Sequence, residues 1–290
     1  MQKIKKILCT ADLSKISLHL LSWGAELSFR LDASFSVFHA IAPPRGSVSR
    51  QIEFERGGEK NEKIQEAHEK INKLMAGFNI KWDLVIGYGD PVLEVAKVAK
   101  KMKPDIIIAE SHGLSGFQQF LIGSVIGRMA QTFSQPFLVI PPGKIVSETN
   151  HPKLKLTNIM IACSLLESDF HLKKYALAFL EKFNSKICLV HVMESPVNED
   201  VVEITSAPYE EAQRLSEEKL SVRLKNFMPA KTHILQGIPG EELALYAKSH
   251  KIDLIIAGGD DHPGRIITTT TAALLRDLPC AVLMVPMKSN

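Results

Sequence analysis

Short apolar runs alternate with longer segments of helical periodicity along the whole chain. The short runs are rich in Ile, Val and Leu and are apolar throughout, which is typical of strands buried between two layers of helices. Segments with apolar residues at three-to-four spacing lie between them and predict helices packed on a sheet. Strands are therefore expected in the first half at residues 4–10, 35–41, 82–86, 105–110 and 136–140.

Two apolar stripes predict the helices that cover this sheet. The first is formed by Ile16, Leu20, Trp23, Leu27 and Leu31, and the second by Val92, Val95, Ala99 and Met102. Residues 55–75 and 208–220 are rich in charge, and we expect both segments to form solvated helices. With right-handed crossovers between parallel strands, the pattern predicts a doubly wound α/β unit.

The second half of the chain repeats the first half. "KKILCTAD" matches "TNIMIACS", "FSVFHAI" matches "ICLVHVM", "GDPVLEVAKVAKKMKPDIIIA" matches "GIPGEELALYAKSHKIDLIIA", and "QPFLVIPP" matches "CAVLMVPM". These ordered matches indicate two tandem copies of one domain. The Pro-rich and polar stretch 141–157 is the natural linker, so we expect domains at residues 1–143 and 155–290.

Composition narrows the class of protein. The chain has 290 residues, of which 45% are hydrophobic, enough to form two cores. Lys and Arg (35) barely exceed Asp and Glu (32), so charge gives no reason to expect nucleic acid or a membrane surface as a partner. We find no signal peptide and no apolar run of about 18 residues, and we expect a cytoplasmic protein. Its four cysteines lie in or beside apolar runs and are expected to be buried reduced thiols.

Candidate binding residues follow the predicted strands of the first copy. Ligands of open α/β sheets bind at the carboxyl ends of the strands, where the strand order reverses. This rule selects Asp12, the turn at 39–41 and the loop from Glu110 to Ser124. Gly113 and Gly123 would let the backbone approach a phosphate, and Ser124 would offer donors at a helix start. The alternative is a connecting loop in which the glycines serve turns and Ser124 is only a cap; the spacing leaves both interpretations open.

Other chemical signals are weaker. Asp12 could hold ribose hydroxyls or an exocyclic amine, or it could cap the helix that follows. His39 and His191 are expected to be structural histidines at strand ends, and "GGDDH" at 258–262 offers too few converging ligands for a metal site. "GYGDPV" lacks the third glycine of a dinucleotide fingerprint, and no nucleophile arrangement is found. We therefore expect a binding protein rather than an enzyme.

The residues at these strand ends resemble the universal stress protein family over nearly the whole chain. In that family an Asp closes the first strand, an H-V step closes the second, and G-x2-G-x9-G-[ST] follows the fourth. Asp12, His39-Ala40 and Gly113 with Gly123-Ser124 match these features here. The resemblance implies two tandem α/β domains of the Rossmann-like, adenine nucleotide alpha-hydrolase-like kind.

The resemblance also implies an adenine nucleotide in the first copy: ATP, ADP or AMP, with or without Mg²⁺. Asp12 and the backbone at Ala40 would hold adenosine. Ala109 and Glu110 would border the site, and the phosphates would meet Gly113, Gly123, Ser124 and Val125. Glu110 stands where the family has its first glycine, and its charge is expected to weaken ATP binding.

The second copy departs further from the family. Gly258 keeps the first glycine, but Asp261 replaces the second, Thr268-Thr269 stand for Gly-Ser, and Ser164 replaces the strand-end Asp. We expect this second site to be lost for ATP.

Three functions are compatible with these features. The first is regulatory or protective nucleotide binding in the first domain only, by a protein whose two domains form an internal pseudo-dimer through the last strands, Phe137–Ile140 and Val282–Val285; the resemblance also allows a homodimer. The second is slow ATP hydrolysis at the same site. The third is a stress scaffold without nucleotide that binds a partner protein or an apolar ligand.

Overall fold

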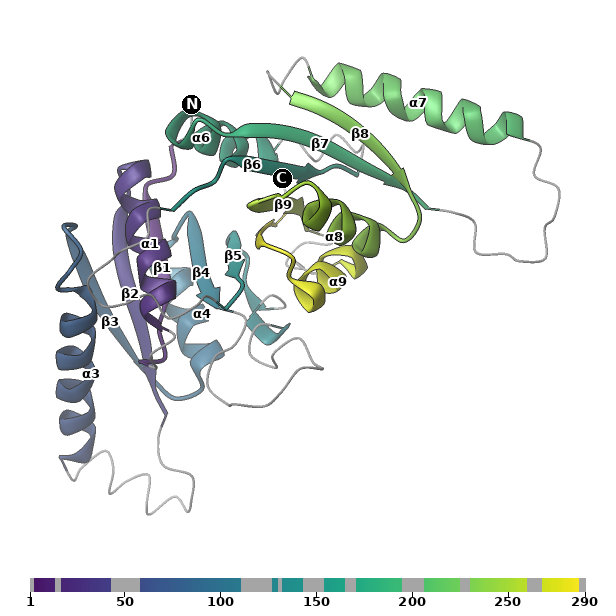
Figure 1. Ribbon diagram of the computed structural model, residues 1–290. Helices are drawn as coiled ribbons and strands as arrows, with labels where there is room; N and C mark the ends of the chain where they lie inside the picture. Colours follow the sequence, from purple (N-terminus) through teal and green to yellow (C-terminus); the bar gives the residue numbers. More distant parts are fainter. Residues whose placement is uncertain are drawn as a thin grey trace. The chain divides into compact units, whose positions relative to one another are not determined.

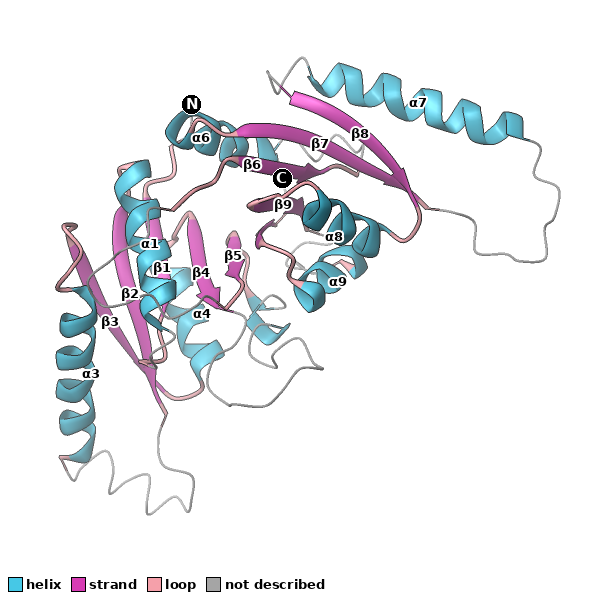
Figure 2. Ribbon diagram, viewed as in Figure 1, coloured by secondary structure: helices cyan, strands magenta, loops and turns pink. Residues whose placement is uncertain are grey.

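The computed structural model divides the chain into two compact units, one spanning Ile4–Leu154 and one formed mainly by Lys155–Asn290. Each unit is an α/β structure with a parallel sheet (Figures 1 and 2). The predicted linker falls largely outside the described residues. The structure describes residues 3–13, 17–42, 58–110, 127–129, 132–142, 154–164, 171–194, 206–224, 230–259 and 268–286.

The first unit has five described strands in the order β3-β2-β1-β4-β5, and all neighbouring pairs are parallel. The strand order reverses between β1 and β4, because the chain first moves outward to β3 and then returns to the other side of β1. The predicted strands are confirmed to within two residues at each end. In chain order the elements are β1 (Lys6–Thr10), α1 (Ser17–Leu31), β2 (Ser34–Ile41), α3 (Glu59–Met75), β3 (Trp82–Tyr88), α4 (Pro91–Met102), β4 (Ile106–Glu110) and β5 (Phe137–Ile140).

Helices α1 and α4 cover opposite faces of this sheet. A Cβ atom on Gly24 of α1 would lie 2.6 Å from the ring of Phe35, so α1 packs on the face that carries Phe35. A Cβ atom on Gly87 would lie 2.9 Å from the ring of Phe38 and 2.8 Å from Cβ of Glu94 in α4. Phe35 and Phe38 are three residues apart on one strand and therefore face opposite sides. The unit is thus doubly wound, as the sequence predicts.

The second unit repeats this topology, with the strand order β10-β9-β6-β7-β8 and parallel pairing throughout. Strand β6 takes the place of β1, and β9 takes the place of β4. The described elements are β6 (Asn158–Ala162), α6 (Lys173–Phe183), β7 (Lys186–Met193), α7 (Ser206–Leu224), β8 (Ala230–Gln236), α8 (Pro239–Ser249), β9 (Leu254–Gly258), α9 (Thr269–Asp277) and β10 (Ala281–Val285).

The repeat extends to individual hydrogen bonds at the amino ends of the strands. Oδ2 of Asp105 accepts hydrogen bonds from the backbone N–H groups of Lys5 (2.8 Å) and Lys6 (3.1 Å). Oδ2 of Asp253 accepts the equivalent bonds from Thr157 (2.7 Å) and Asn158 (2.8 Å). Each carboxylate therefore ties the start of one central strand to the start of its neighbour.

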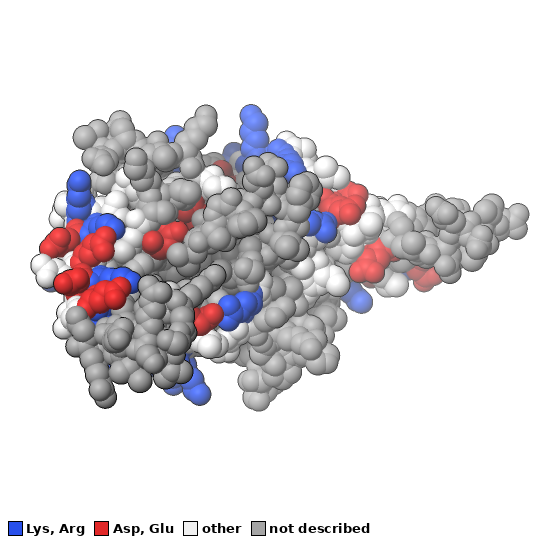
Figure 3. Space-filling model, turned by 90° about the horizontal axis from the view of Figure 1, so that it is seen from below, with Lys and Arg blue, Asp and Glu red and all other residues white. Residues whose placement is uncertain are grey.

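Burial agrees with most of the expectations from composition. Helix α3 is a solvated helix with one apolar face, formed by Ala67, Ile71 and Met75. On the face shown in Figure 3, acidic and basic side chains are interspersed over the described surface. Within the described ranges, no helix is both long and apolar enough to cross a membrane.

Three cysteines are buried, but Cys188 is only half-buried, which corrects the expectation for that residue.

Candidate functional site

Asp12 and Ala40 lie at the carboxyl ends of neighbouring strands in the first unit. The backbone N–H of Ala11 donates to the carbonyl of Phe38 at 2.8 Å, so pairing with β2 continues beyond the end of β1. Since Thr10 pairs with Phe38, continuing this register brings Asp12, which is half-buried, level with Ala40 near the end of β2. The carboxylate and the Ala40 backbone therefore share one edge of the sheet.

His39 forms a hydrogen bond that joins the ends of β1 and β2. Its Nδ1 lies 2.8 Å from the carbonyl oxygen of Ala11, and because a carbonyl only accepts, Nδ1 carries the proton and donates. Burial lowers the pKa of His39, while the bond to Ala11 and the charge of Asp12 partly oppose that shift. The neutral ring then leaves Nε2 as an acceptor.

The second unit contains the same arrangement without the acid. Nδ1 of His191 lies 2.9 Å from the carbonyl oxygen of Cys163, whose own N–H donates to Val190 at 2.9 Å. Ser164, at the position of Asp12, is exposed. The same histidine contact is therefore present in both copies, and both histidines lie at strand ends, as the sequence predicts.

Ala109 and Glu110 end strand β4 on the other side of β1. Ala109 is buried, and Glu110 is only 8% exposed. Ile108 pairs with Cys9, and residues two apart share a face, so Glu110 points to the face that carries Cys9 and is covered by α1. The pKa of the Cys9 thiol is raised, mainly by burial and further by the charge of Glu110. Glu110 thus belongs to the site's edge by backbone position, with its side chain inside the protein.

The described part of the candidate site therefore comprises Asp12, Ala40, Ala109 and Glu110. They lie at the carboxyl ends of β2, β1 and β4, where the strand order reverses. The other predicted site residues, Gly113, Gly123, Ser124 and Val125, lie outside the described residues, as does Asp261 of the second copy.

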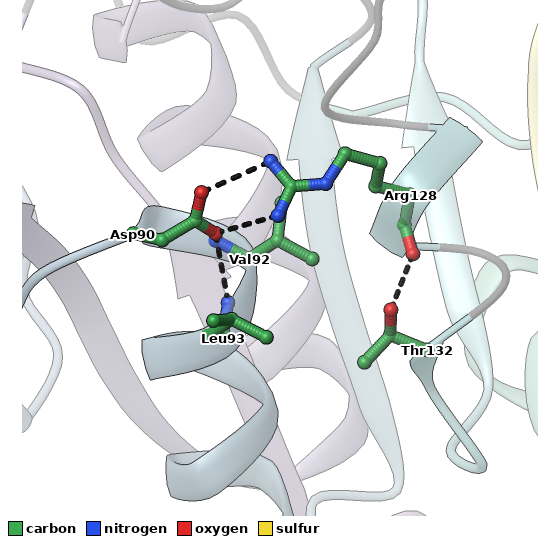
Figure 4. A network of polar contacts seen from close by, with 5 residues as sticks. All are labelled: Asp90, Val92, Leu93, Arg128 and Thr132. Atoms are coloured by element: carbon green, nitrogen blue, oxygen red, sulfur yellow. Dashed lines mark hydrogen bonds and ion pairs between the residues drawn. The ribbon is translucent and has the colours of Figure 1, made fainter.

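A polar network that sequence reasoning missed lies at the start of α4 (Figure 4). Oδ1 of Asp90 accepts hydrogen bonds from the backbone N–H groups of Val92 (3.0 Å) and Leu93 (3.1 Å) and so caps the helix. Arg128 donates from Nη1 to Oδ2 and from Nη2 to Oδ1, each at 3.0 Å. The hydrogen bond from Arg128 is the main reason why the pKa of Asp90 is lowered.

A signal for the cap exists in "GYGDPV". An Asp followed by Pro before an apolar periodic segment is typical of a helix start, with Asp as cap and Pro at the first helical position. No such signal exists for Arg128, which contacts Asp90 across 38 residues of chain. As a half-exposed ion pair, the contact contributes about 0–1 kcal/mol to stability.

At the matching position in the second unit, helices α8 and α9 meet by close packing of small residues. Ile238 stands at the position of Asp90 and provides no side-chain cap. A Cβ atom on Gly240 of α8 would lie 2.3 Å from Cβ of Ala273 in α9, so these helices touch through their smallest side chains. Helix α9 begins with a capping box between Thr268 and Thr271, in which the N–H of Thr271 donates to Oγ1 of Thr268 at 3.0 Å. The threonine that stands for the glycine of Gly-Ser therefore acts as a helix cap.

A cluster of aromatic and imidazole rings in the second unit was not predicted from the sequence either. The rings of Tyr246 and His250 are stacked, with centroids 3.8 Å apart, and the ring of His233 lies 5.2 Å from Tyr246. Burial and a hydrogen bond with Cys188 raise the pKa of Tyr246 to about 12. The repeat places Val85, Val98 and Met102 of the first unit at the positions of His233, Tyr246 and His250.

This cluster predicts that the second unit loses stability as the pH falls. The pKa of His233 is lowered, mainly by burial and further by the charges of His250 and Lys231. An unfolded histidine with a pKa near 6.5 then binds more protons than His233 does in the folded protein, so stability is present above about pH 6.5 and is lost below it. Since His233 is only partly buried, the slope should be well below the roughly 1.4 kcal/mol per pH unit of one full proton.

Urea unfolding of the wild type and of His233→Gln between pH 5 and 7, followed by circular dichroism, tests this prediction. The variant should show the shallower dependence on pH. Equal slopes for the two proteins would show that His233 carries no such linkage.

Comparison with known proteins identifies similar chains over both units. The model of the Universal stress protein family matches residues 3–141 and 155–286. Universal stress protein MJ0531 of Methanocaldococcus jannaschii is 27% identical over 142 residues, 48% of this chain and 84% of that protein. Universal stress protein MJ0577 of the same organism is 32% identical over 108 residues, 37% of this chain and 65% of that protein.

Solved structures show the same fold over both units. A universal stress protein from Archaeoglobus fulgidus DSM 4304 has a TM-score of 0.68 at 19% identity, covering 99% of this chain and 100% of that one. The functionally unknown protein PA1789 from Pseudomonas aeruginosa PAO1 has a TM-score of 0.68 at 12% identity, covering 98% and 93%. At these identities the likeness concerns the fold alone.

Proposed function

Because the chain belongs to the universal stress protein family, with one family domain in each half, we propose that it binds an adenine nucleotide in the first unit only. Its role would be regulatory or protective binding without turnover. The observation that supports this proposal best is the meeting of Asp12, Ala40 and Ala109 at the carboxyl ends of β1, β2 and β4, where the strand order reverses. In the second unit, Ser164 replaces the acid and Thr268 is engaged as a helix cap.

Each residue of the proposed site has a distinct role. The carboxylate of Asp12 would accept hydrogen bonds from ribose hydroxyls, and the backbone at Ala40 would contact the adenine edge. Gly113, Gly123, Ser124 and Val125 would supply backbone and hydroxyl donors to the phosphates of ATP, ADP or AMP. The described residues contain no group of three His, Cys, Asp or Glu side chains that could hold a metal ion. Where Mg²⁺ accompanies the nucleotide, phosphate oxygens and water would be among its ligands.

The nucleotide is identified by mass spectrometry of the small molecules released when freshly purified protein is denatured. We expect AMP, ADP or ATP at about one molecule per chain or less. If none is released and calorimetric titration with all three shows no binding, the proposal fails and a scaffold function takes its place. Release of ADP from added ATP over time would instead indicate slow hydrolysis.

Replacing Asp12 by alanine is expected to weaken nucleotide binding by about 1–3 kcal/mol, because buried polar groups of the ligand lose their partner. Calorimetry with ATP and AMP measures the loss, and Ser164→Ala in the second unit is the matched control, expected to leave affinity unchanged. Thermal melts of the ligand-free proteins distinguish the helix-cap role of Asp12. A large fall in melting temperature with unchanged affinity would assign Asp12 to the cap instead.

A further inference from the structure

The outer face of helix α8 is formed by Ile238, Glu241, Leu245 and Lys248. Leu245 is 59% exposed, and Ile238, two helical turns earlier, is 56% exposed. Glu241 and Lys248 lie on the same side of the helix and are exposed as well. The opposite side of α8, which lies beside α9 (Figure 1), is buried and is formed by Gly240, Leu243, Ala244 and Ala247.

The matching helix of the first unit is charged at the two apolar positions. The repeat places Asp90 and Lys97 at the positions of Ile238 and Leu245. Nζ of Lys97 lies 2.6 Å from Oε1 of Glu94, so this charge is paired within α4. Because the two helices have the same place in the same fold, the fold itself does not require a leucine at 245. Single exposed apolar side chains are common on protein surfaces, so the neighbours of Leu245 decide whether it has a partner.

Two charges of opposite sign flank Leu245, and both are available to a partner. Among the described residues, neither Glu241 nor Lys248 takes part in an ion pair. Glu241 lies about 6 Å from Leu245 along the helix in one direction, and Lys248 lies about 4.5 Å away in the other. With 3.6 residues per turn, they are rotated about 40° and 60° to the same side of Leu245. This arrangement is complementary to itself when the helix direction is reversed.

We propose that the outer face of α8 is a docking surface for a second copy of this chain, with the two α8 helices antiparallel about a two-fold axis at Leu245. A two-fold interface brings the same surface of both copies together. Leu245 then contacts Leu245 of the second copy, and Glu241 of each copy faces Lys248 of the other. On the other flank Glu242 faces Ser249, so no like charges are opposed. The first unit could not pair in this way, because Lys97 would face Lys97.

The size of this surface predicts a weak dimer. A standard interface buries about 800 Å² per partner, and one face of an 11-residue helix provides less than that. Interfaces below the standard size belong to weak or transient complexes. We therefore expect a dimer that forms with rising protein concentration, with a dissociation constant on the order of micromolar or above.

Sedimentation equilibrium of the full chain between about 5 and 500 µM tests the inference. The weight-average mass of the wild type should rise with concentration from 32.2 kDa toward twice that value. Leu245→Lys introduces the residue of the first unit and should raise the dissociation constant at least about tenfold, because it places two lysines against each other. Lys100→Glu, at the exposed position in α4 that matches Lys248, is the matched control and should associate as the wild type does.

Reversal of the flanking charges tests the antiparallel arrangement. Glu241→Lys and Lys248→Glu should each weaken association at least about tenfold, because each places like charges opposite one another. An equimolar mixture of these two variants should associate as strongly as the wild type, since every contact then joins opposite charges. A misfolded variant could not be rescued in this way. A wild type that stays monomeric up to about 500 µM, single variants that associate like the wild type, or a mixture that stays monomeric would overturn the inference.

Discussion

Replacing Gly240 by valine is expected to destabilise the second unit by about 3 kcal/mol, the upper end of the usual cost of overpacking. A Cβ atom on Gly240 would lie 2.3 Å from Cβ of Ala273 and 3.2 Å from the carbonyl oxygen of Thr270. Helix α9 cannot move aside freely, because its first turn is fixed by the capping box of Thr268 and Thr271 and the side chain of Thr271 is buried. The two helices would have to separate, and contacts with the sheet would be lost.

The two units can be followed separately in this experiment. Both tryptophans of the chain, Trp23 and Trp82, lie in the first unit, in α1 and β3. In urea, the circular dichroism signal of Gly240→Val should show an early transition, while the tryptophan fluorescence keeps its wild-type midpoint. Gly240→Ala combined with Ala273→Gly moves the glycine to the other helix and should recover part of the stability. An unchanged circular dichroism midpoint in Gly240→Val would contradict the close packing of α8 and α9.

The strands and their order of appearance could be predicted because burial on both faces leaves a continuous apolar run. Ile106, Ile107 and Ile108 illustrate this, since all three are fully buried in β4 although they alternate between the faces of the sheet. The internal repeat could be predicted as well, because matching sequence segments form matching strands in two units with the same strand order. This part of the fold is therefore determined by the local sequence pattern and by burial.

The contacts between distant residues could not be predicted from the sequence. The face to which Glu110 points follows from the pairing of Ile108 with Cys9, which is a property of the strand register. The partner of Asp90 is 38 residues away and carries no spacing signal. In the second unit, the stacking of Tyr246 on His250 depends on helix α8, whereas the matching positions in the first unit carry ordinary apolar residues. The types of residue indicate which side chains could interact, but strand register and helix packing determine which of them are in contact.

Comparison of the two copies distinguishes contacts that both units share from contacts that occur in one unit. Asp105 and Asp253 make the same backbone hydrogen bonds, and His39 and His191 secure the same strand end. These shared contacts serve the fold of both units. Other features differ between the units: Asp12 is matched by Ser164, Glu110 by Gly258, and the stacked rings of Tyr246 and His250 by Val98 and Met102. Variants at Asp12 and Glu110, which lie at the proposed site, should affect ligand binding more than stability.

Replacing Glu110 by glutamine is expected to tighten ATP binding in the first unit at least about tenfold. Glu110 ends β4 at the edge where the phosphates would lie, and its side chain is buried on the α1 face. A negative charge about 10 Å from a phosphate charge at an effective dielectric constant near 20 gives a repulsion of roughly 1.7 kcal/mol, and about 3 kcal/mol at 5 Å. Burial weakens the screening of this charge by salt. A tenfold change in affinity corresponds to about 1.4 kcal/mol.

Two substitutions distinguish the charge from the backbone. Glu110→Gln removes the charge and keeps the size of the side chain, whereas Glu110→Gly restores the residue that the family has at this position. Both should bind ATP more tightly than the wild type in calorimetric titrations at one salt concentration, and the gain should be smaller for AMP, which carries fewer phosphate charges. Glu62→Gln, an exposed substitution in α3, controls for the change in net charge. Mg²⁺ should reduce the gain, because it neutralises the phosphates. Unchanged or weaker ATP binding in Glu110→Gln would mean that the carboxylate either does not act on the phosphates or contributes to holding the ligand.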